Sequence, residues 1–233
     1  MNGHLRITLL VTLFLAACGG ATTSAEPTGA DPNHPGSADS SSKVDPRTDE
    51  ELPVAPFCSA GANVDVDKAI FAALAPEPSA AYLSLRRNVG KIPDLTDELE
   101  VVAERGQLCG DATTVAACTN AYNAIRPKIG IVHLCFTRGD IAKCVESTAD
   151  AVALLGHVHS IEEAAFIAQY AGYWASCTSL VTRGKALEDG SFRLVIAKGG
   201  DCGPLYRAVI NVSRDGAVKE LASTFVRDID ICP

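Results

Sequence analysis

The 233-residue sequence predicts an α+β fold in which N-terminal helices precede a mainly antiparallel, disulfide-stabilised sheet. Three observations lead to this fold class. Between residues 63 and 125, apolar residues recur at helical spacing, and proline or glycine follows each run. From residue 173 onward, runs rich in β-branched and aromatic residues are separated by Asp-Gly pairs. Nine cysteines supply enough thiols for several disulfide bonds.

Four helices are expected in the first half of the chain. Their ranges are residues 63–74, 79–88, 94–106 and 111–125. The first begins at Asn63 or Asp65 and the third at Asp94 or Thr96, because short polar side chains can cap the start of a helix. A proline or glycine, which seldom continues a helix, lies at the end of each range or two residues after it.

A β-hairpin is expected next, at residues 131–145. Strands at 131–136 and 141–145 flank a turn in which Gly139 supplies the required backbone freedom. Arg138-Gly139-Asp140 also matches a short adhesion tripeptide. Since Gly and Asp are what a tight turn needs in any case, we interpret the tripeptide as turn chemistry.

Two short helices follow the hairpin, at residues 147–155 and 160–172. Ser160 and Glu163 form a capping box, in which the hydroxyl and the carboxylate each satisfy a backbone N–H at the helix start. A helix beginning at Ser160 is therefore expected to run to Gly172.

The C-terminal part is predicted to be an antiparallel meander. Its strands are placed at residues 173–180, 192–198, 205–213 and 217–227. Asp189-Gly190 and Asp215-Gly216 lie between strands, as hairpin turns require. In the third strand, apolar residues alternate with polar ones, which places one face inward and one in water.

The first 17 residues are typical of a secretory signal peptide. Arg6 precedes an apolar or hydroxyl run at residues 7–15, and the small residues Ala16 and Ala17 follow. The run is about nine residues long, whereas a helix needs roughly 20 to cross a bilayer. We therefore expect cleavage rather than a permanent transmembrane helix.

Leu15-Ala16-Ala17-Cys18 resembles the lipobox of bacterial lipoproteins. The resemblance implies that the Cys18 thiol takes a diacylglyceryl group, that cleavage occurs before Cys18, and that the new amino group is acylated, as with palmitate. Three acyl chains would give a stable membrane anchor. By the same resemblance, Gly19 in place of Asp favours the outer membrane. The alternative is an ordinary signal peptide that ends near a free cysteine.

Residues 18–56 are expected to be a disordered linker between the lipid anchor and a domain at residues 57–233. The segment is rich in Ala, Thr, Ser, Gly, Pro and Asp and has no aromatic residue before Phe57. Such a composition buries too little apolar surface to offset the entropy of ordering. The formal net charge of −8 argues against nucleic acid as a partner, because nucleic-acid binding depends on Lys and Arg.

An even number of cysteines remains once Cys18 is assigned to lipid, which predicts a disulfide framework in an exported protein. The remaining cysteines are Cys58, Cys109, Cys118, Cys135, Cys144, Cys177, Cys202 and Cys232. The sequence does not determine the pairing, but we expect a local Cys109–Cys118 bond and ties from the last three cysteines to the C-terminal sheet. Zinc is the alternative, yet the chain lacks the Cys-x-x-Cys spacing that zinc sites usually contain.

His157 and His159 are weak candidates for a metal site. Residues two apart in a strand or loop point the same way, and Glu162 and Glu163 follow closely. No third ligand is identified by spacing, so two surface histidines are the simpler interpretation. We expect no metal and no cofactor.

Tyr170, Tyr173 and Trp174 cluster where the last helix is expected to meet the sheet. These rings could line a ligand pocket. Aromatic residues at such a junction are more often core, because each buries a large apolar area.

The sequence contains no nucleophile elbow, zinc-protease motif, phosphate loop or dinucleotide fingerprint, so an enzyme is the less favoured interpretation. We expect a membrane-anchored cell-envelope lipoprotein with a binding or structural role, attached to membrane lipid through Cys18 and contacting an unknown envelope protein or ligand. One alternative is an envelope hydrolase that uses His133, His157 or His159. The other is a small-ligand receptor domain that uses the aromatic junction.

Overall fold

The computed structural model describes residues 52–89, 98–128, 132–178, 180–199 and 203–228. The predicted signal peptide, the lipobox and the linker up to residue 51 lie outside these ranges, as do Cys202 and Cys232. Within the described residues the protein has an α+β fold with two antiparallel sheets, which confirms the predicted fold class.

The first sheet, called sheet 1, has the strand order β2-β1-β3-β4. Its strands are β1 (Tyr82–Asn88), β2 (Leu99–Gly106), β3 (Val132–Arg138) and β4 (Ile141–Cys144). The second sheet, called sheet 2, has the order β5-β7-β8-β9, with β6 paired to β7. Its strands are β5 (Tyr173–Trp174), β6 (Arg183–Ala186), β7 (Phe192–Gly199), β8 (Pro204–Val212) and β9 (Val218–Asp228). All strand pairings among the described residues are antiparallel.

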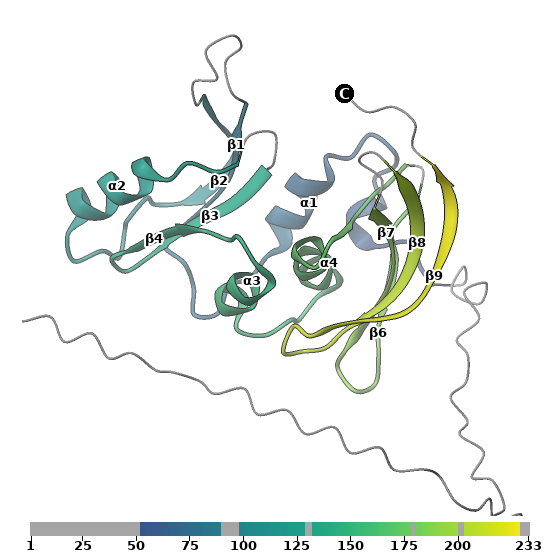
Figure 1. Cartoon of the computed structure of the whole chain (residues 1–233). Helices are drawn as coiled ribbons and strands as arrows, with labels where there is room; N and C mark the ends of the chain where they lie inside the picture. The colour runs from purple at the N-terminus through teal and green to yellow at the C-terminus, as the bar shows by residue number, and fades with distance from the viewer. Residues whose placement is uncertain (1–51, 90–97, 129–131, 179, 200–202, 229–233) are drawn as a thin grey trace, which may run out of the picture. The chain divides into compact units, whose positions relative to one another are not determined.

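Three of the four described helices lie between the two sheets, and the fourth covers the other face of sheet 1 (Figure 1). The helices between the sheets are α1 (Val66–Ala73), α3 (Thr148–Leu155) and α4 (Ile161–Tyr170), and α2 (Val115–Ala124) lies outside. A short 3-10 helix, η2 (Pro56–Cys58), precedes α1. Sheet 1 is therefore covered by helices on both faces.

One apolar core joins both sheets to the helices between them. It contains Leu83 and Leu134 from sheet 1, Leu154 from α3, Ile167 from α4 and Ile210 from sheet 2. Each of these side chains is at most 3% exposed. The burial of these apolar side chains is the main source of stability, because about 25 cal/mol is gained per Å² of apolar surface removed from water.

Two of the predicted helices are wrong. Residues 79–88 contain strand β1, and the described part of 94–106 contains strand β2; residues 94–97 lie outside the described residues. In β1 the side chains of Leu83 and Leu85 enter the main core, while Ser84 and Arg86 face α2 and are equally buried. The sequence does alternate from Leu83 to Arg86, but both faces of the strand are covered, so the polar residues of the alternation are buried against α2 rather than in water.

The remaining elements agree closely with the sequence, apart from the start of sheet 2. Helices α1, α2, α3 and α4, the β3–β4 hairpin and strands β7, β8 and β9 all form where they were predicted. The strand predicted at 173–180 is shortened to Tyr173–Trp174, and β6 was not predicted. The Thr182 hydroxyl, which accepts from the Ser176 N–H at 2.9 Å, holds the segment after β5 in a turn rather than a strand.

The capping box at α4 forms with one change. The Ser160 hydroxyl accepts from the Glu163 N–H at 3.1 Å, as predicted. The Glu163 carboxylate instead accepts from the His159 N–H at 2.7 Å and from the Ala75 N–H at 2.9 Å. Glu163 is 1% exposed, so its carboxylate is a buried link between the end of α1 and the start of α4.

Candidate functional site

Six cysteines of the described residues form three disulfide bonds. Cys109–Cys118 and Cys135–Cys144 each span nine residues, and Cys58–Cys177 spans 119. The predicted local Cys109–Cys118 bond is confirmed. Cys177 ties η2 to the segment that follows β5, whereas the predicted roles of Cys202 and Cys232 lie outside the described residues. Bonds of this kind persist in oxidising compartments.

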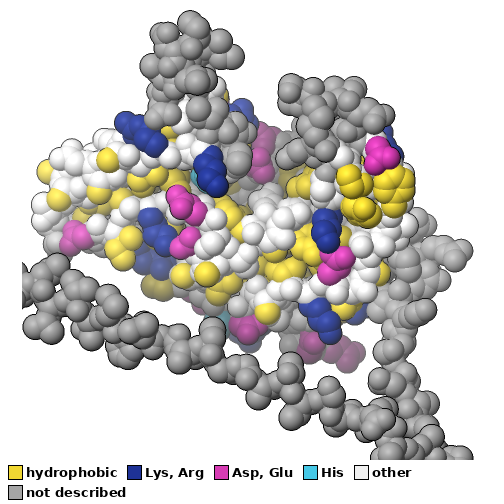
Figure 2. All heavy atoms as spheres, in the orientation of Figure 1, with side chains coloured by type: hydrophobic (Ala, Val, Ile, Leu, Met, Phe, Trp, Pro, Cys, Tyr) yellow, Lys and Arg dark blue, Asp and Glu magenta, His cyan; other side chains and the backbone are white. Residues whose placement is uncertain are grey.

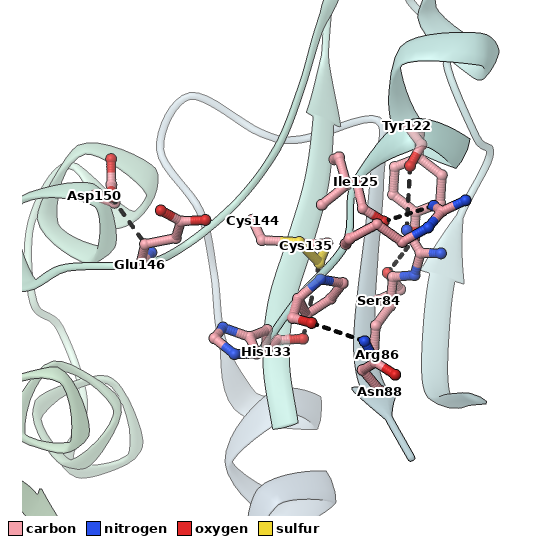
Figure 3. The surroundings of a disulfide bond; sticks show 12 residues. Ser84, Arg86, Asn88, Tyr122, Ile125, His133, Cys135, Cys144, Glu146 and Asp150 are labelled. Carbon is pink, nitrogen blue, oxygen red and sulfur yellow. Dashed lines mark hydrogen bonds between the residues drawn. A yellow bond between two sulfur atoms is a disulfide. The ribbon is translucent and has the colours of Figure 1, made fainter. Parts of the chain in front are cut away.

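The Cys135–Cys144 bond belongs to an unusually polar layer between sheet 1 and α2. Ser84, Arg86 and Asn88 of β1 and His133 of β3 are all at most 8% exposed. Figure 3 shows Ser84 and Arg86 gathered with Tyr122 on one side of the disulfide, while the imidazole of His133 points away from them. Buried polar groups of this kind need partners, so their contacts define what the layer does.

Arg86 caps the C-terminal end of α2. One guanidinium nitrogen donates to the Tyr122 carbonyl at 3.2 Å, and the guanidinium carbon lies 4.6 Å from the centre of the Tyr122 ring. The Tyr122 hydroxyl is hydrogen-bonded to Ser84. The last turn of α2 has no basic residue of its own, so Arg86 and Arg126, which lies just after the helix, supply the positive charge that the helix dipole favours there. The Arg126 guanidinium donates to the Asn123 and Ile125 carbonyls. These contacts give Arg86 a structural role, although its Nε atom is buried without a hydrogen-bond partner.

Two further arginines of sheet 1 cap helices in the same way. Arg105 of β2 donates to the Ala72 carbonyl at 3.1 Å and to the Leu74 carbonyl at the end of α1. Arg138 of β3 donates to the Leu154 carbonyl of α3 at 3.0 Å. Burial lowers the pKa of both guanidinium groups, which remain charged because the unperturbed value is so high. Sheet 1 thus provides the basic ends that these helices lack.

Both charged residues of the tripeptide Arg138-Gly139-Asp140 are engaged in hydrogen bonds within the domain. Asp140 accepts from the Thr113 N–H at 2.9 Å and the Thr114 N–H at 3.2 Å, and also from the Thr113 hydroxyl. The Thr113 hydroxyl bond is the main cause that lowers the pKa of this carboxyl, followed by the Thr114 N–H. Both charged residues of the tripeptide therefore hold helix ends, which supports the turn interpretation.

The three histidines proposed for a hydrolase do not come together. His133 begins β3, whereas Arg138 at the other end of that strand contacts Leu154 near the loop that carries His157 and His159. Five residues of strand separate these two ends by about 17 Å. The histidine Nε2 atom of His133 is buried without a hydrogen-bond partner.

His157 and His159 do lie side by side, on the loop between α3 and α4. Their ring centroids are 6.2 Å apart, and His159 Nε2 lies 3.6 Å from a carboxylate oxygen of Glu77. The pKa of the Asp215 carboxyl is lowered chiefly by the hydrogen bond from the Ser213 hydroxyl. The nearby His157 adds a smaller lowering of this pKa. Among the described residues, no three His, Cys, Asp or Glu side chains are grouped to hold a metal ion.

A small pocket lies between α1, α4 and the core face of sheet 1. Its walls are apolar, and its polar members are Asp67, Gln169 and Tyr170. Burial, followed by the charge of Asp65, raises the pKa of Asp67, to which Gln169 donates at 3.4 Å. The space open to the centre of a water molecule is about 20 Å³, which is room for one or two water molecules.

The aromatic junction predicted from the sequence divides into three separate environments. Tyr170 lines the small pocket, and Trp174 donates from Nε1 to the Gly199 carbonyl at 2.7 Å. Tyr173 donates to Glu220 at 2.8 Å, and Lys198 donates to the same carboxylate oxygen at 2.8 Å. Trp174 and Tyr173 do not line the described pocket, so the three rings form no common ligand site there.

Sequence reasoning missed the residues with the most demanding contacts. The contacts of Arg86, Arg105, Glu163 and Glu220 reach groups between 22 and 88 positions away in the sequence. The only signal was the charge of Arg86 within a stretch of alternating apolar residues, which the helical interpretation concealed.

Comparison of the chain with protein-family models, curated proteins and solved structures finds no match. In the described part of the chain, no helix combines the length and apolar character needed to cross a membrane. The site residues must therefore be judged from their own geometry.

Proposed function

We propose that this chain is an exported bacterial protein, held at the cell envelope by lipid on Cys18, whose α+β domain binds an envelope partner. The observation that carries the proposal is the pairing of the cysteines. All six in the described residues are bonded to one another, which leaves the lipobox cysteine outside that set. Three disulfides favour an oxidising compartment, which an export signal would reach.

We favour a binding role over catalysis, because the charged side chains described above are already engaged in structural contacts. Arg86, Arg105, Arg138 and Asp140 hold helix ends. His133 lies in a different layer from His157 and His159, so the hydrolase alternative gains no support. The small-ligand alternative gains none either, because the described pocket has room for water only. Retention at the outer membrane, suggested by Gly19, is part of the proposal.

Mass spectrometry of the N-terminal peptide tests the anchor. The full chain is expressed in a bacterial host that processes lipoproteins, and the membrane fraction is extracted with detergent. We expect a chain that begins at an acylated Cys18, while the control Cys18→Ser is recovered without lipid. An unmodified Cys18, or a chain that retains Met1, would contradict the proposal.

Thiol titration under denaturing conditions tests the compartment. The framework prediction includes Cys202 and Cys232, so the mature protein is expected to show no free thiol beyond an unacylated Cys18. Two or more free thiols in the acylated protein would be incompatible with four bridges. Partial reduction before titration serves as the positive control.

A further inference from the structure

The edges of the two sheets are protected to different degrees. An edge strand presents unpaired N–H and C=O groups that can pair with another chain, and proteins block this with short strands or charges. The edge strands β4, β5 and β6 have four, two and four residues. Strand β2 has eight residues, among them Glu100, Glu104 and Arg105. These four edges are therefore short or charged.

Strand β9 is the exception, because it is long and its charged residues, Lys219, Glu220, Arg227 and Asp228, lie only at its two ends. It is the longest described strand, with eleven residues, and it pairs with β8 along one edge. No strand in the described ranges pairs with its other edge. Residues 221–226 read Leu-Ala-Ser-Thr-Phe-Val, with no charge, proline or glycine. Such a segment has the composition of a strand that adds readily to another.

The C-terminal half of β9 is exposed on both sides of the sheet. Every residue from Ser223 to Asp228 is exposed, including Phe225 at 54% and Val226 at 42%. Figure 2 shows a hydrophobic patch over the upper ends of β8 and β9, beside basic and acidic side chains. A large apolar side chain left in water on an unpaired edge indicates an interaction surface.

We propose that the free edge of β9 binds an extended, acidic segment of another polypeptide as an added strand. This inference deepens the proposed function and rests on it, since it names the class of partner that the domain takes. Main-chain hydrogen bonds would supply affinity, and alternate side chains would supply specificity.

The register with β8 assigns the side chains of β9 to the two sides of the sheet. Residues opposite each other in an antiparallel pair point to the same side. On β8, Ala208 and Ile210 belong to the main core, so Ser223 and Glu220 opposite them face the core side. The outer side takes the residues opposite the alternate positions of β8. These are Lys219, Ala222, Thr224 and Arg227.

The outer side of β9 is therefore basic at both ends and uncharged between them. Lys219 and Arg227 are its only ionisable residues, and Arg193 of β7 lies on the same side, opposite Asn211. This local positive charge contrasts with the net charge of −8 for the whole chain. An added strand gains most from acidic residues facing Lys219 and Arg227.

A second copy of this chain is a poor occupant. Antiparallel pairing of two β9 strands about a two-fold axis forms one continuous sheet, in which the outer sides of both strands lie on the same face. Paired about the middle of the strand, Lys219 would then lie near Arg227 of the second copy, and like charges opposite each other are destabilising. The symmetric arrangement is opposed by its own charges.

The N-terminal linker is also a poor occupant. Its acidic charge would suit the edge, but between residues 19 and 51 it contains Pro27, Pro32, Pro35 and Pro46. Proline cannot donate to a ladder, and the longest stretch without it, residues 36–45, has Val44 as its only large aliphatic residue. A different polypeptide is therefore a better occupant than either the linker or a second copy.

The spacing of the partner's acidic residues follows from β8. Leu205 and Asn211 lie opposite Arg227 and Lys219 and are six positions apart, because the β8–β9 pairing contains two bulges. A regular strand on the other edge would need two acidic residues about six positions apart on its outer side. An even spacing keeps both carboxylates on one side.

A prearranged surface on the core side can receive an apolar side chain of the partner. Tyr173, Lys198, Tyr206 and Phe225 form a continuous row of cross-strand neighbours. The rings of Tyr206 and Phe225 lie 6.0 Å apart, and Glu220 accepts from Lys198 and Tyr173. Because these groups hold one another, little ordering is needed on binding.

Deuterium exchange on the full mature chain in detergent micelles tests the inference. The probe is a synthetic eleven-residue peptide of alternating threonine and valine, in which two threonines six positions apart are glutamates. A second peptide carries lysines at the same two positions. We expect the glutamate peptide to slow exchange at residues 219–228, and the lysine peptide to bind about tenfold more weakly, as two lost surface ion pairs imply.

Charge reversal provides the matched variant. Lys219→Glu with Arg227→Glu is expected to exchange the preference, so that the lysine peptide binds better. Lys68→Glu with Lys128→Glu, two exposed lysines outside sheet 2, changes the net charge equally and is expected to keep the original preference. The wild-type comparison of the two peptides remains decisive if the reversed variant does not fold.

Equal binding of the two peptides, or no slowing at residues 219–228, would overturn the inference. A protein that is already dimeric with a protected β9, and becomes monomeric on Phe225→Lys, would assign the edge to a second copy instead. Acylation of Cys18 is measured separately. A missing lipid would therefore refute the anchor without affecting the proposed strand addition. Absence of peptide binding at β9 would refute the strand addition without affecting the anchor.

Discussion

Sheets 1 and 2 are stabilised by different means. Sheet 1 has helices on both faces, two local disulfides and three arginines that cap neighbouring helices. Sheet 2 packs helix α4 on one side and ends in the long exposed strand β9. The two sheets differ because the helices packed on them bury different amounts of apolar surface. α2 buries only Cys118 and Tyr122, whereas α4 buries six residues.

The comparison shows how a helix with little apolar surface can still be fixed in place. Its N-terminal end is held by Asp140, its C-terminal end by Arg86, and its middle by the Cys109–Cys118 bond. Each attachment is worth about 1 to 3 kcal/mol, which replaces the hydrophobic burial that α4 obtains. Polar residues near α2 are thus used for architecture, and the exposed edge of sheet 2 is left for binding.

The disulfides should give the largest effects. Replacing both Cys58 and Cys177 by serine is expected to lower the free energy of unfolding by about 5 kcal/mol, because that bond closes a loop of 119 residues. Replacing Cys109 and Cys118, which close nine residues, should cost about 2.5 kcal/mol. Equilibrium unfolding in urea measures both. Equal losses would contradict the chain-entropy explanation.

The two faces of sheet 1 should respond differently to truncation. Leu134→Ala removes a side chain that is 1% exposed in the main core and should cost about 3 kcal/mol. Ser84→Ala, on the face toward α2, removes the hydrogen bond to Tyr122 and should cost about 1 kcal/mol. Urea unfolding provides the measurement. A larger loss at Ser84 would mean that the polar layer, not the apolar core, dominates this sheet.

Arg86→Met tests helix capping by the sheet. The substitution keeps most of the apolar stem but removes the hydrogen bond to the Tyr122 carbonyl and one of the two cations at the end of α2, since Arg126 remains. It should lower the free energy of unfolding by about 1 to 2 kcal/mol. Arg87→Met is the control, because Arg87 is exposed and lies 3.8 Å from Glu100 in a surface ion pair worth at most about 1 kcal/mol. Thermal unfolding followed by circular dichroism compares them. The capping explanation fails if the two variants are equally stable.

Acid should weaken the attachment of α2 by the smallest amount. Hydrogen bonds, first from the Thr113 hydroxyl, hold the pKa of Asp140 below its ordinary value. A depressed folded-state pKa contributes stability that is present above the unfolded value near 3.8 and lost as the pH falls through the folded value. Asp140→Asn should therefore make stability less dependent on pH below about 4. Urea midpoints between pH 5 and 2 test this, with Asp189→Asn in a turn of sheet 2 as a comparison.

Local patterns were sufficient for the elements whose signals lie within a few residues. The Ser160 cap and the Asp189-Gly190 and Asp215-Gly216 turns depend on neighbours in the sequence, and the structure has them as predicted. The prediction that one face of β8 lies in water was wrong, because Leu205 and Val209 on that face are each 1% exposed. β1 failed because its polarity is set by distant elements: Ser84 and Arg86 are buried by α2, some 36 to 38 positions away.

The candidate sites divide in the same way. His157 and His159 could be placed together from their spacing, and they do lie together. The grouping of Tyr170, Tyr173 and Trp174 could not be judged from proximity in sequence, since a strand and a helix turn successive side chains in different directions. The unprotected edge of β9 was beyond sequence reasoning too, because strand order is a property of the whole fold.

The sequence by itself determined the α+β class, the periodicity of helices and meander, and a lipobox resemblance at Cys18. Tertiary structure alone decided which arginines cap which helices, which strand became an edge, and where Glu163 and Glu220 found their hydrogen bonds. Periodicity depends on residues one to four positions apart in the sequence. A buried charge instead takes its hydrogen bonds from whichever backbone or side-chain groups the tertiary packing places next to it.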